Sequence, residues 1–194
     1  RIQMNTSKTI AVVGDSKGIG ESLREQLLSQ GHKVIGVSRS GVQRGPDASG
    51  DYQSLVFDAA AHPCDLSGFT EHLDGLVYCP GTIRLKPLKG LKKEHALEDW
   101  TINAWGAAQT LQANYALLQK SDQASVVLFG TVAVQTGMPF HASIAMAKGA
   151  VEGLARSLAA EWSPKIRVNA IAPSITDTPL ASGLLGNDAK KEAS

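Results

Sequence analysis

The 194-residue sequence predicts an α/β fold, a doubly wound parallel sheet covered by helices on both faces, forming a single domain over residues 1–194. Two observations predict it. Short apolar runs alternate with helical patterns along the chain, which is typical of parallel strands joined by helices. With 43% hydrophobic and 19% charged residues, the chain can also fill a sizeable core.

Six apolar runs are expected to form the strands of this sheet. They are TIAVV at 9–13, KVIGV at 33–37, SLVF at 54–57, LDGLVY at 73–78, SVVLF at 125–129 and IRVNAI at 166–171. Runs this short, in a sequence that alternates with helical patterns, fit strands buried on both faces.

Helical periodicity separates several of these runs. Ile19, Leu23 and Leu27 recur every four residues, and Gly31 follows them as a helix-ending residue. A long helix is expected over about 97–119. Another helix carries one apolar stripe, formed by Ile144, Val151, Leu154 and Leu158.

Charge and cysteine content exclude several classes of function. The formal net charge of +1 gives no general attraction to nucleic acid or to an anionic membrane. The apolar run 10–13 is too short for a signal sequence or a membrane span. Two cysteines make a disulfide framework unexpected and favour the cytoplasm. His62, Cys64, His72 and Cys79 match no standard zinc spacing, so no metal site is predicted.

The segment VVGDSKGIG at 12–20 places a glycine-rich turn between the first strand and the first helix. Glycine lets the backbone approach a ligand closely, and the helix N-terminus offers free N–H groups to a pyrophosphate. This context predicts a Rossmann-type, NAD(P)-binding domain, although the spacing is G-x-x-x-G-x-G. A tight turn without a ligand is the alternative. The predicted cofactor residues of this loop are Gly14, Asp15, Ser16, Lys17, Gly18, Ile19 and Gly20.

The end of the second strand favours NADP(H) over NAD(H). A site for NAD(H) would place an acidic residue there to bind the ribose hydroxyl. This chain has Ser38 and Arg39 instead, and Lys17 lies in the glycine loop, so the charges suit a 2′-phosphate. The alternative is that both cations are ordinary solvated surface residues.

Several ordered motifs together resemble the short-chain dehydrogenase/reductase family, from Thr9 to about Leu180. VVGDSKGIG resembles its glycine motif, and KGAVEGLARSLAAEW at 148–162 follows the family closely. The resemblance assigns further cofactor contacts to Asp58, to Cys79, Pro80 and Gly81 of LVYCPG, to Lys148, and to Pro173, Ser174, Thr176 and Thr178 of IRVNAIAPSITDTP. It also implies that the chain lacks the usual C-terminal helix and strand.

The resemblance implies definite catalytic roles. A tyrosine exchanges the proton at the substrate oxygen, and a lysine four residues later binds the nicotinamide ribose and lowers the pKa of that tyrosine. Lys148 matches the lysine, Asn103 of INAWG matches an asparagine that holds a relay water, and Thr131 takes the place of a serine that orients the carbonyl. Ile144 stands where the tyrosine belongs and has no proton to give.

Two residues are candidates to replace the missing acid. His141 lies one turn before Ile144 on the expected helix, and an imidazole is a chemically suitable acid near neutral pH. A packing or solvent-facing role at the helix entrance is the alternative for His141. Tyr78 ends the fourth strand near the expected cofactor edge, where a core role is favoured.

The sequence therefore predicts an NADP(H)-dependent oxidoreductase that acts on a small-molecule carbonyl or alcohol. The alternatives are a regulatory protein that binds NADP(H) without catalysis, and a structural partner in a mixed oligomer. Faces rich in Ala and Gly around 104–108 and 147–155, with the family resemblance, imply a homodimer or homotetramer. RLKPLKGLKK at 84–93 is either a solvated loop or an attractor for an anionic substrate.

Overall fold

A computed structural model describes residues 7–43 and 50–182. Six parallel strands form one sheet in the order β3-β2-β1-β4-β5-β6. The strands are β1 (Thr9–Val13), β2 (Lys33–Ser38), β3 (Tyr52–Val56), β4 (Gly75–Tyr78), β5 (Ala124–Phe129) and β6 (Ile166–Ile171). The predicted doubly wound fold is confirmed, while the predicted domain limits at residues 1 and 194 lie outside the described residues.

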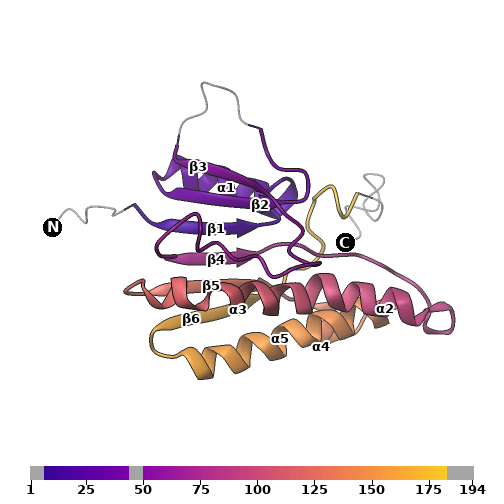
Figure 1. Cartoon of the computed structure of the whole chain (residues 1–194). Helices are drawn as coiled ribbons and strands as arrows, with labels where there is room; N and C mark the ends of the chain where they lie inside the picture. Colours follow the sequence, from indigo (N-terminus) through magenta and orange to yellow (C-terminus); the bar gives the residue numbers. More distant parts are fainter. Residues whose placement is uncertain (1–6, 44–49, 183–194) are drawn as a thin grey trace.

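Helices cover the sheet on both faces (Figure 1). Helix α1 packs against β1 and β2, whereas α3 packs against β4 and β5, and α5 against β5 and β6. The helical elements are α1 (Gly18–Ser29), η1 (Leu88–Gly90), α2 (Lys93–Trp100), η2 (Thr101–Trp105), α3 (Gly106–Gln119), α4 (Ala133–Thr136) and α5 (Ala142–Trp162).

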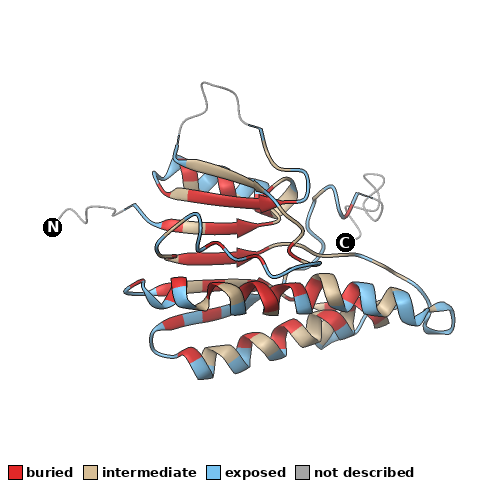
Figure 2. Cartoon of the chain, in the orientation of Figure 1, coloured by how far each residue is buried: buried red, intermediate tan, exposed pale blue. Residues whose placement is uncertain are grey.

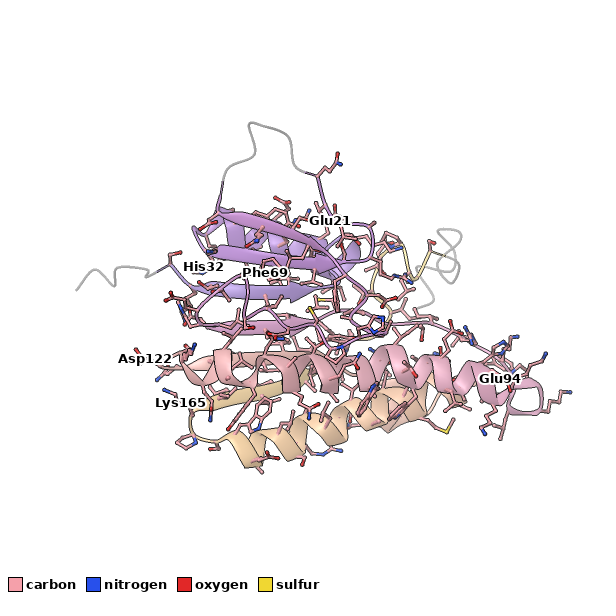
Figure 3. The ribbon with its side chains drawn as sticks, viewed as in Figure 1. Glu21, His32, Phe69, Glu94, Asp122 and Lys165 are labelled. Carbon is pink, nitrogen blue, oxygen red and sulfur yellow. The ribbon has the colours of Figure 1, made fainter. Side chains whose placement is uncertain are left out.

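Alternation along the central strands divides the core into two layers. Val12 and Val34 pack with the apolar face of α1, whereas Ala11, Val13 and Ile35 face the layer that contains α3 and α5. Successive side chains of a strand point to opposite faces, so a fully apolar strand fills both layers. The central strands β1, β2 and β4 are accordingly buried almost throughout (Figure 2). Charged side chains such as Glu94, Asp122 and Lys165 project from the ends of the helical layer (Figure 3).

The long helix expected over 97–119 forms, but it is interrupted. It begins earlier, as α2 at Lys93, and the five residues of η2 form a π-helical turn before α3. Such turns occur frequently at functional sites. The predicted strand 54–57 is shifted toward the N-terminus, because Tyr52 already pairs with Val34 of β2.

No helix among the described residues is long and apolar enough to cross a bilayer. Within the same residues, His, Cys, Asp and Glu side chains form no cluster of three or more that could hold a metal ion.

Candidate functional site

The candidate site lies between the carboxyl ends of β1 and β4, where the order in which strands are added to the sheet reverses. Such a switch point opens a crevice in doubly wound sheets. The glycine loop leaves β1 and meets the loop that follows β4, because a Cβ on Gly14 would lie 3.0 Å from Pro80. Gly14 has φ +83° and donates its N–H to the carbonyl of Val37 at 2.7 Å. Only glycine allows this close crossing without strain.

The rest of the glycine loop lies against the segment after β6. Gly18 has φ +62°, and a Cβ there would lie 3.5 Å from Thr178. A Cβ on Gly20 would collide with the carbonyl oxygen of Gly14. A cleft of about 520 Å³ borders both segments; among the predicted cofactor residues, Gly18, Ile19, Thr176 and Thr178 line it. Predicted residues from the two ends of the chain therefore meet at one cleft.

Asp15 is the predicted cofactor residue whose side chain turns inward. It is fully buried, accepts a hydrogen bond from Tyr52 Oη at 2.5 Å, and lies 3.6 Å from the guanidinium of Arg24. Arg24 also donates to the Asp15 carbonyl and is itself buried. Burial and the hydrogen bond to Asp15 raise the pKa of Tyr52 to about 12. The Asp15 carboxylate therefore holds the glycine loop from beneath, and the predicted contact of Asp15 with the cofactor would involve its backbone.

The residues expected to read the adenosine ribose lie at the end of β2. Ser38 is buried, and its Oγ has no hydrogen-bond partner among the described residues. Arg39 and Lys17 are exposed, so their cationic groups can meet an anion from solvent. Asp58, in the loop after β3, is half-buried and accepts the N–H of Ala60 at 3.0 Å. An unpartnered buried hydroxyl beside exposed cations fits a phosphorylated ribose.

Lys148 reaches the ends of β4 and β5 from α5. Its Nζ donates to the carbonyl of Phe129 at 2.8 Å, and a Cβ on Gly81 would lie 3.5 Å from this Nζ. Burial lowers the pKa of Lys148 to about 8, although the nearby Cys79 thiol partly opposes the shift. Burial in turn raises the pKa of Cys79 to about 12, so this thiol is not a nucleophile at neutral pH.

Asn103 faces Lys148 from the π-helical turn. The same Cβ position on Gly81 is 3.1 Å from Asn103 Oδ1, an oxygen that is buried and accepts no hydrogen bond from the described residues. The amide nitrogen is fully used, since it donates to Thr82 Oγ1 at 2.9 Å and to the carbonyl of Asp99 at 2.7 Å. These two bonds fix the amide so that its oxygen faces the site.

A buried carboxylate that sequence reasoning missed anchors this arrangement. Asp99 is fully buried and accepts hydrogen bonds from Thr82 Oγ1 at 2.7 Å and from Ser143 Oγ at 2.5 Å. The network joins the β4 loop, α2 and the start of α5. The signal in the sequence is an acidic residue four positions before Asn103 on the same helical face, although Ser143 and Thr82 are distant in the chain.

The chain is similar to proteins of one known family. A family model described as enoyl-(acyl carrier protein) reductase matches residues 13–194. A tropinone reductase homolog of Arabidopsis thaliana is 31% identical over 206 residues, covering 95% of this chain and 74% of the relative. Senescence-associated protein 13 of the same plant is 32% identical over 208 residues, covering 95% and 74%.

The chain belongs to the short-chain dehydrogenase/reductase family. Solved structures share its fold at lower identity. The RhlG/NADP complex of Pseudomonas aeruginosa has a TM-score of 0.83 at 24% identity, covering 96% of this chain and 79% of that one. Ligand-free aldohexose dehydrogenase of Thermoplasma acidophilum has a TM-score of 0.82 at 23% identity, covering 96% and 76%.

In this short-chain dehydrogenase/reductase an apolar side chain stands where the sequence analysis expects the family tyrosine. Ile144 is 5% exposed and lies one helical turn before Lys148 on α5. Thr131 follows β5 and is half-buried; its Oγ1 accepts the N–H of Ala133 at 3.3 Å. The hydroxyl hydrogen of Thr131 stays available to a substrate oxygen.

Each of the two candidate replacement acids makes a hydrogen bond to a backbone carbonyl. His141 precedes α5 and places its Nδ1 2.7 Å from the carbonyl of Pro139, so that nitrogen carries the proton and donates it there. Tyr78 is buried and donates its hydroxyl to the carbonyl of Ile102 at 2.8 Å. Burial raises the pKa of Tyr78, and the predicted core role of this tyrosine is confirmed.

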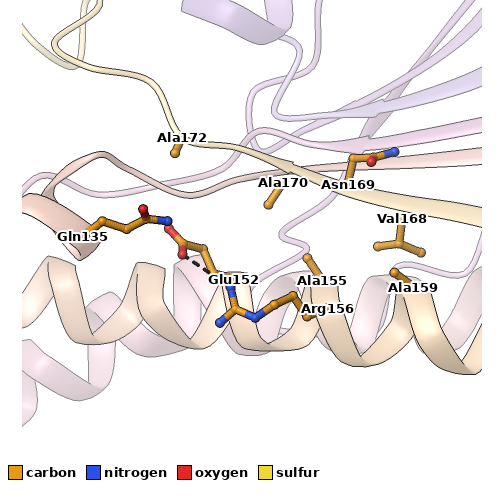
Figure 4. Close-up of a pocket in the computed structure, with 9 residues that line it drawn as sticks. All are labelled: Gln135, Glu152, Ala155, Arg156, Ala159, Val168, Asn169, Ala170 and Ala172. Atoms are coloured by element: carbon orange, nitrogen blue, oxygen red, sulfur yellow. Dashed lines mark ion pairs between the residues drawn. The ribbon is translucent and has the colours of Figure 1, made fainter.

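A second hollow, of about 270 Å³, lies between α5 and β6 (Figure 4). Glu152 is buried there, 3.7 Å from the guanidinium of Arg156, and its other carboxylate oxygen has no partner among the described residues. A Cβ on Gly130 would lie 2.9 Å from that oxygen. None of the predicted catalytic or cofactor residues lines this hollow.

Proposed function

We propose that this short-chain dehydrogenase/reductase is an NADP(H)-dependent oxidoreductase that interconverts a small-molecule carbonyl and its alcohol. The convergence of Lys148 and Asn103 beside Gly81 is the observation that carries the proposal. A lysine whose ammonium is largely buried, with no carboxylate partner among the described residues, is costly to keep unless it serves a ligand.

The preference for NADP(H) rests on charge at the end of β2. Lys17 and Arg39 supply cations, and Ser38 supplies a hydroxyl without a partner among the described residues. The residues that directly end β2, Ser38 and Arg39, include no acid that would repel a 2′-phosphate. The fold relative RhlG was solved with NADP, which is in keeping with this choice.

The cofactor supplies hydride when bound; the chain supplies position and polarity. The glycine loop would hold the pyrophosphate against the start of α1, and Lys148 would hold the nicotinamide ribose. Thr176 and Thr178 line the cleft, and Pro173 and Ser174 would contact the cofactor from the same segment. Thr131 would orient the substrate carbonyl from the end of β5. Orientation of this kind accounts for about 7–11 kcal/mol of barrier lowering, whereas general acid catalysis contributes about 10²–10⁴-fold.

A carbonyl-substrate screen with NADPH tests the proposal. Wild type should oxidise NADPH slowly but in a substrate-dependent way, and Ile144→Tyr should raise turnover because it adds a phenolic proton donor to the site. His141→Ala is the matched control and should leave the rate near that of wild type. Tighter binding of NADH than of NADPH would contradict the cofactor assignment.

A second candidate function is an NADP(H)-binding protein without turnover, and Ile144 is the observation that favours it. Under that function, wild type binds NADPH but does not oxidise it, whichever carbonyl substrate is added, while Ile144→Tyr gains activity. We further propose a cytoplasmic homodimer or homotetramer, without nucleic-acid or membrane partners; the net charge of +1 and the apolar surface of α2 and α5 support this.

A further inference from the structure

We propose that Lys148 is itself the proton donor of this enzyme, in addition to holding the nicotinamide ribose. The inference rests on the proposed function and names the group that completes the reaction where the family tyrosine has been replaced by Ile144. It follows from which proton-bearing groups surround the site and which of them are already committed elsewhere.

Most titratable groups near Lys148 are committed to other partners. The Tyr78 hydroxyl is buried against the carbonyl of Ile102, on the inner side of the sheet. The Asp99 carboxylate accepts two hydroxyl hydrogen bonds and has no exposed surface, so it has no open path to a substrate. The Glu152 carboxylate faces the hollow between α5 and β6, next to Arg156.

The remaining groups near the crevice are equally unsuited. His141 precedes α5, about two helical turns before Lys148, and its Nδ1 donates to the carbonyl of Pro139. The Cys79 thiol, after β4, has a pKa raised to about 12 by burial and so releases its proton too reluctantly. Asp15 lies beneath the glycine loop and binds Tyr52 and Arg24.

Lys148 has N–H donors that are available to the space next to Gly81. An ammonium has three N–H donors, and the described residues use one of them, at the carbonyl of Phe129. The Nζ and Asn103 Oδ1 both border the point next to Gly81, at 3.5 Å and 3.1 Å from a Cβ placed there. The unpartnered Asn103 oxygen can hold a water between the ammonium and the substrate oxygen, and Thr131 lies two residues beyond Phe129.

The environment makes this ammonium acidic. No described carboxylate forms an ion pair with Lys148, and burial lowers its pKa to about 8. A group with a pKa close to the working pH is protonated at neutral pH and still gives up its proton readily. An ordinary exposed lysine, with a pKa of about 10.4, would be a far poorer acid.

The proposed step balances. Hydride from the reduced nicotinamide adds to the carbonyl carbon; the carbon–oxygen π bond breaks, the carbonyl is reduced and the cofactor is oxidised. The electron pair on oxygen takes one proton from Lys148, directly or through the water at Asn103. The lysine is left as a neutral amine and regains its proton from solvent.

Substitutions that separate charge from acidity test the proposal. Lys148→Arg keeps a cation near the ribose but removes the releasable proton, since guanidinium is effectively always protonated. It should bind NADPH and lose turnover by about 10²-fold or more. Ile144→Tyr added to Lys148→Arg should recover turnover, because the phenol supplies the proton. Wild-type turnover in Lys148→Arg with NADPH bound would overturn the inference.

A measurement without turnover gives a second readout. In the cofactor-free protein, acylation of Lys148 by an amine-reactive reagent, followed by mass spectrometry, should be half-maximal near pH 8. The same peptide in the denatured protein should require about pH 10.4. Identical curves would remove the inference while leaving the proposed function intact. A wild type that binds NADPH but reduces no carbonyl would instead overturn the proposed function, and the inference with it.

Discussion

At the scale of single residues, burial and charge conflict most directly at Lys148. Its ammonium is largely buried at the ends of β4 and β5, and its hydrogen bond among the described residues is to a backbone carbonyl, not to a carboxylate. The folded state therefore binds this proton less tightly than the unfolded chain does. Below pH 8 the lysine is charged in both states and lowers the free energy of unfolding by its full desolvation penalty.

We predict that Lys148→Met stabilises the cofactor-free protein at pH 7, by an amount on the order of 2 kcal/mol. The gain should shrink as the pH rises through 8 and disappear near pH 10.5, where the lysine is neutral in both states. Urea unfolding at several pH values measures it. A stabilisation that does not change with pH would point to packing rather than charge as its cause.

Asp99 shows how a residue can matter without touching a ligand. It supplies both acceptors for Thr82 and Ser143, and through Thr82 it fixes the amide of Asn103. Removing one acceptor leaves a buried hydroxyl unpaired, which costs about 1–3 kcal/mol.

We predict that Asp99→Asn lowers the free energy of unfolding by about that amount. The neighbouring Glu98→Gln is the matched control, because Glu98 forms an exposed pair with Arg84 at 2.6 Å and should change stability by less than about 1 kcal/mol. Equal losses for the two variants in urea unfolding would contradict the role assigned to the buried network.

The order of motifs in the chain predicted a site that contains Lys148 and Asn103, and the structure brings these two side chains to Gly81. The inward orientation of the Asp15 side chain was not predictable in this way. Its partners, Tyr52 and Arg24, come from other elements, and single-sequence patterns do not show which polar side chains meet in space.

At the scale of elements, the glycine loop requires glycine at Gly20 because there is no room for a side chain, and not only because glycine is flexible. Gly20 lies in the first turn of α1, where a side chain would collide with the Gly14 carbonyl. Gly68, in contrast, has nothing within 4 Å of its Cβ position.

We predict that Gly20→Ala weakens NADPH binding and destabilises the fold by about 1–3 kcal/mol, because the loop must move away from the helix. Gly68→Ala should change stability by no more than about 0.5 kcal/mol. Fluorescence titration with NADPH and thermal unfolding provide the two measurements. Unchanged affinity in Gly20→Ala would show that the crossing at Gly14 is not part of the cofactor site.

The π-helical turn is the element that periodicity could not reveal. A pattern with 3.6 residues per turn predicts a continuous helix over 97–119, whereas one turn with five residues places Asn103 inward and brings Trp100 and Trp105 together. The strand β6, by contrast, was predicted with its observed bounds, since its apolar run stands between clear breaks.

At the scale of the whole molecule, one surface is unusually apolar for an exposed face. Trp100, Trp105 and Met146 are 43%, 46% and 58% exposed, on the neighbouring elements α2, η2 and α5. Exposed tryptophan and methionine are enriched at protein interfaces. The fold class itself followed from strand and helix alternation, but an assembly surface depends on which residues remain uncovered after folding.

We predict that the protein self-associates through this surface and that Met146→Glu shifts it toward the monomer. A carboxylate buried in an apolar interface without a partner weakens association severely. Val56→Glu is the control, because Val56 is 71% exposed on the edge strand β3 and should leave the assembly unchanged. Light scattering across a concentration series measures both variants, and a wild-type monomer at every concentration would refute the prediction.

The stacked indoles of Trp100 and Trp105, with ring centroids 6.0 Å apart, lie on either side of Asn103 in the chain. The remaining tryptophan, Trp162, packs against Tyr115 at the other end of α5. Indole emission overlaps the absorption of reduced nicotinamide, so energy transfer would quench the emission of the stacked pair when NADPH occupies the crevice. The emission would recover when the cofactor is oxidised. The π-helical turn thus gives the protein a built-in optical probe beside the residues that matter for its chemistry.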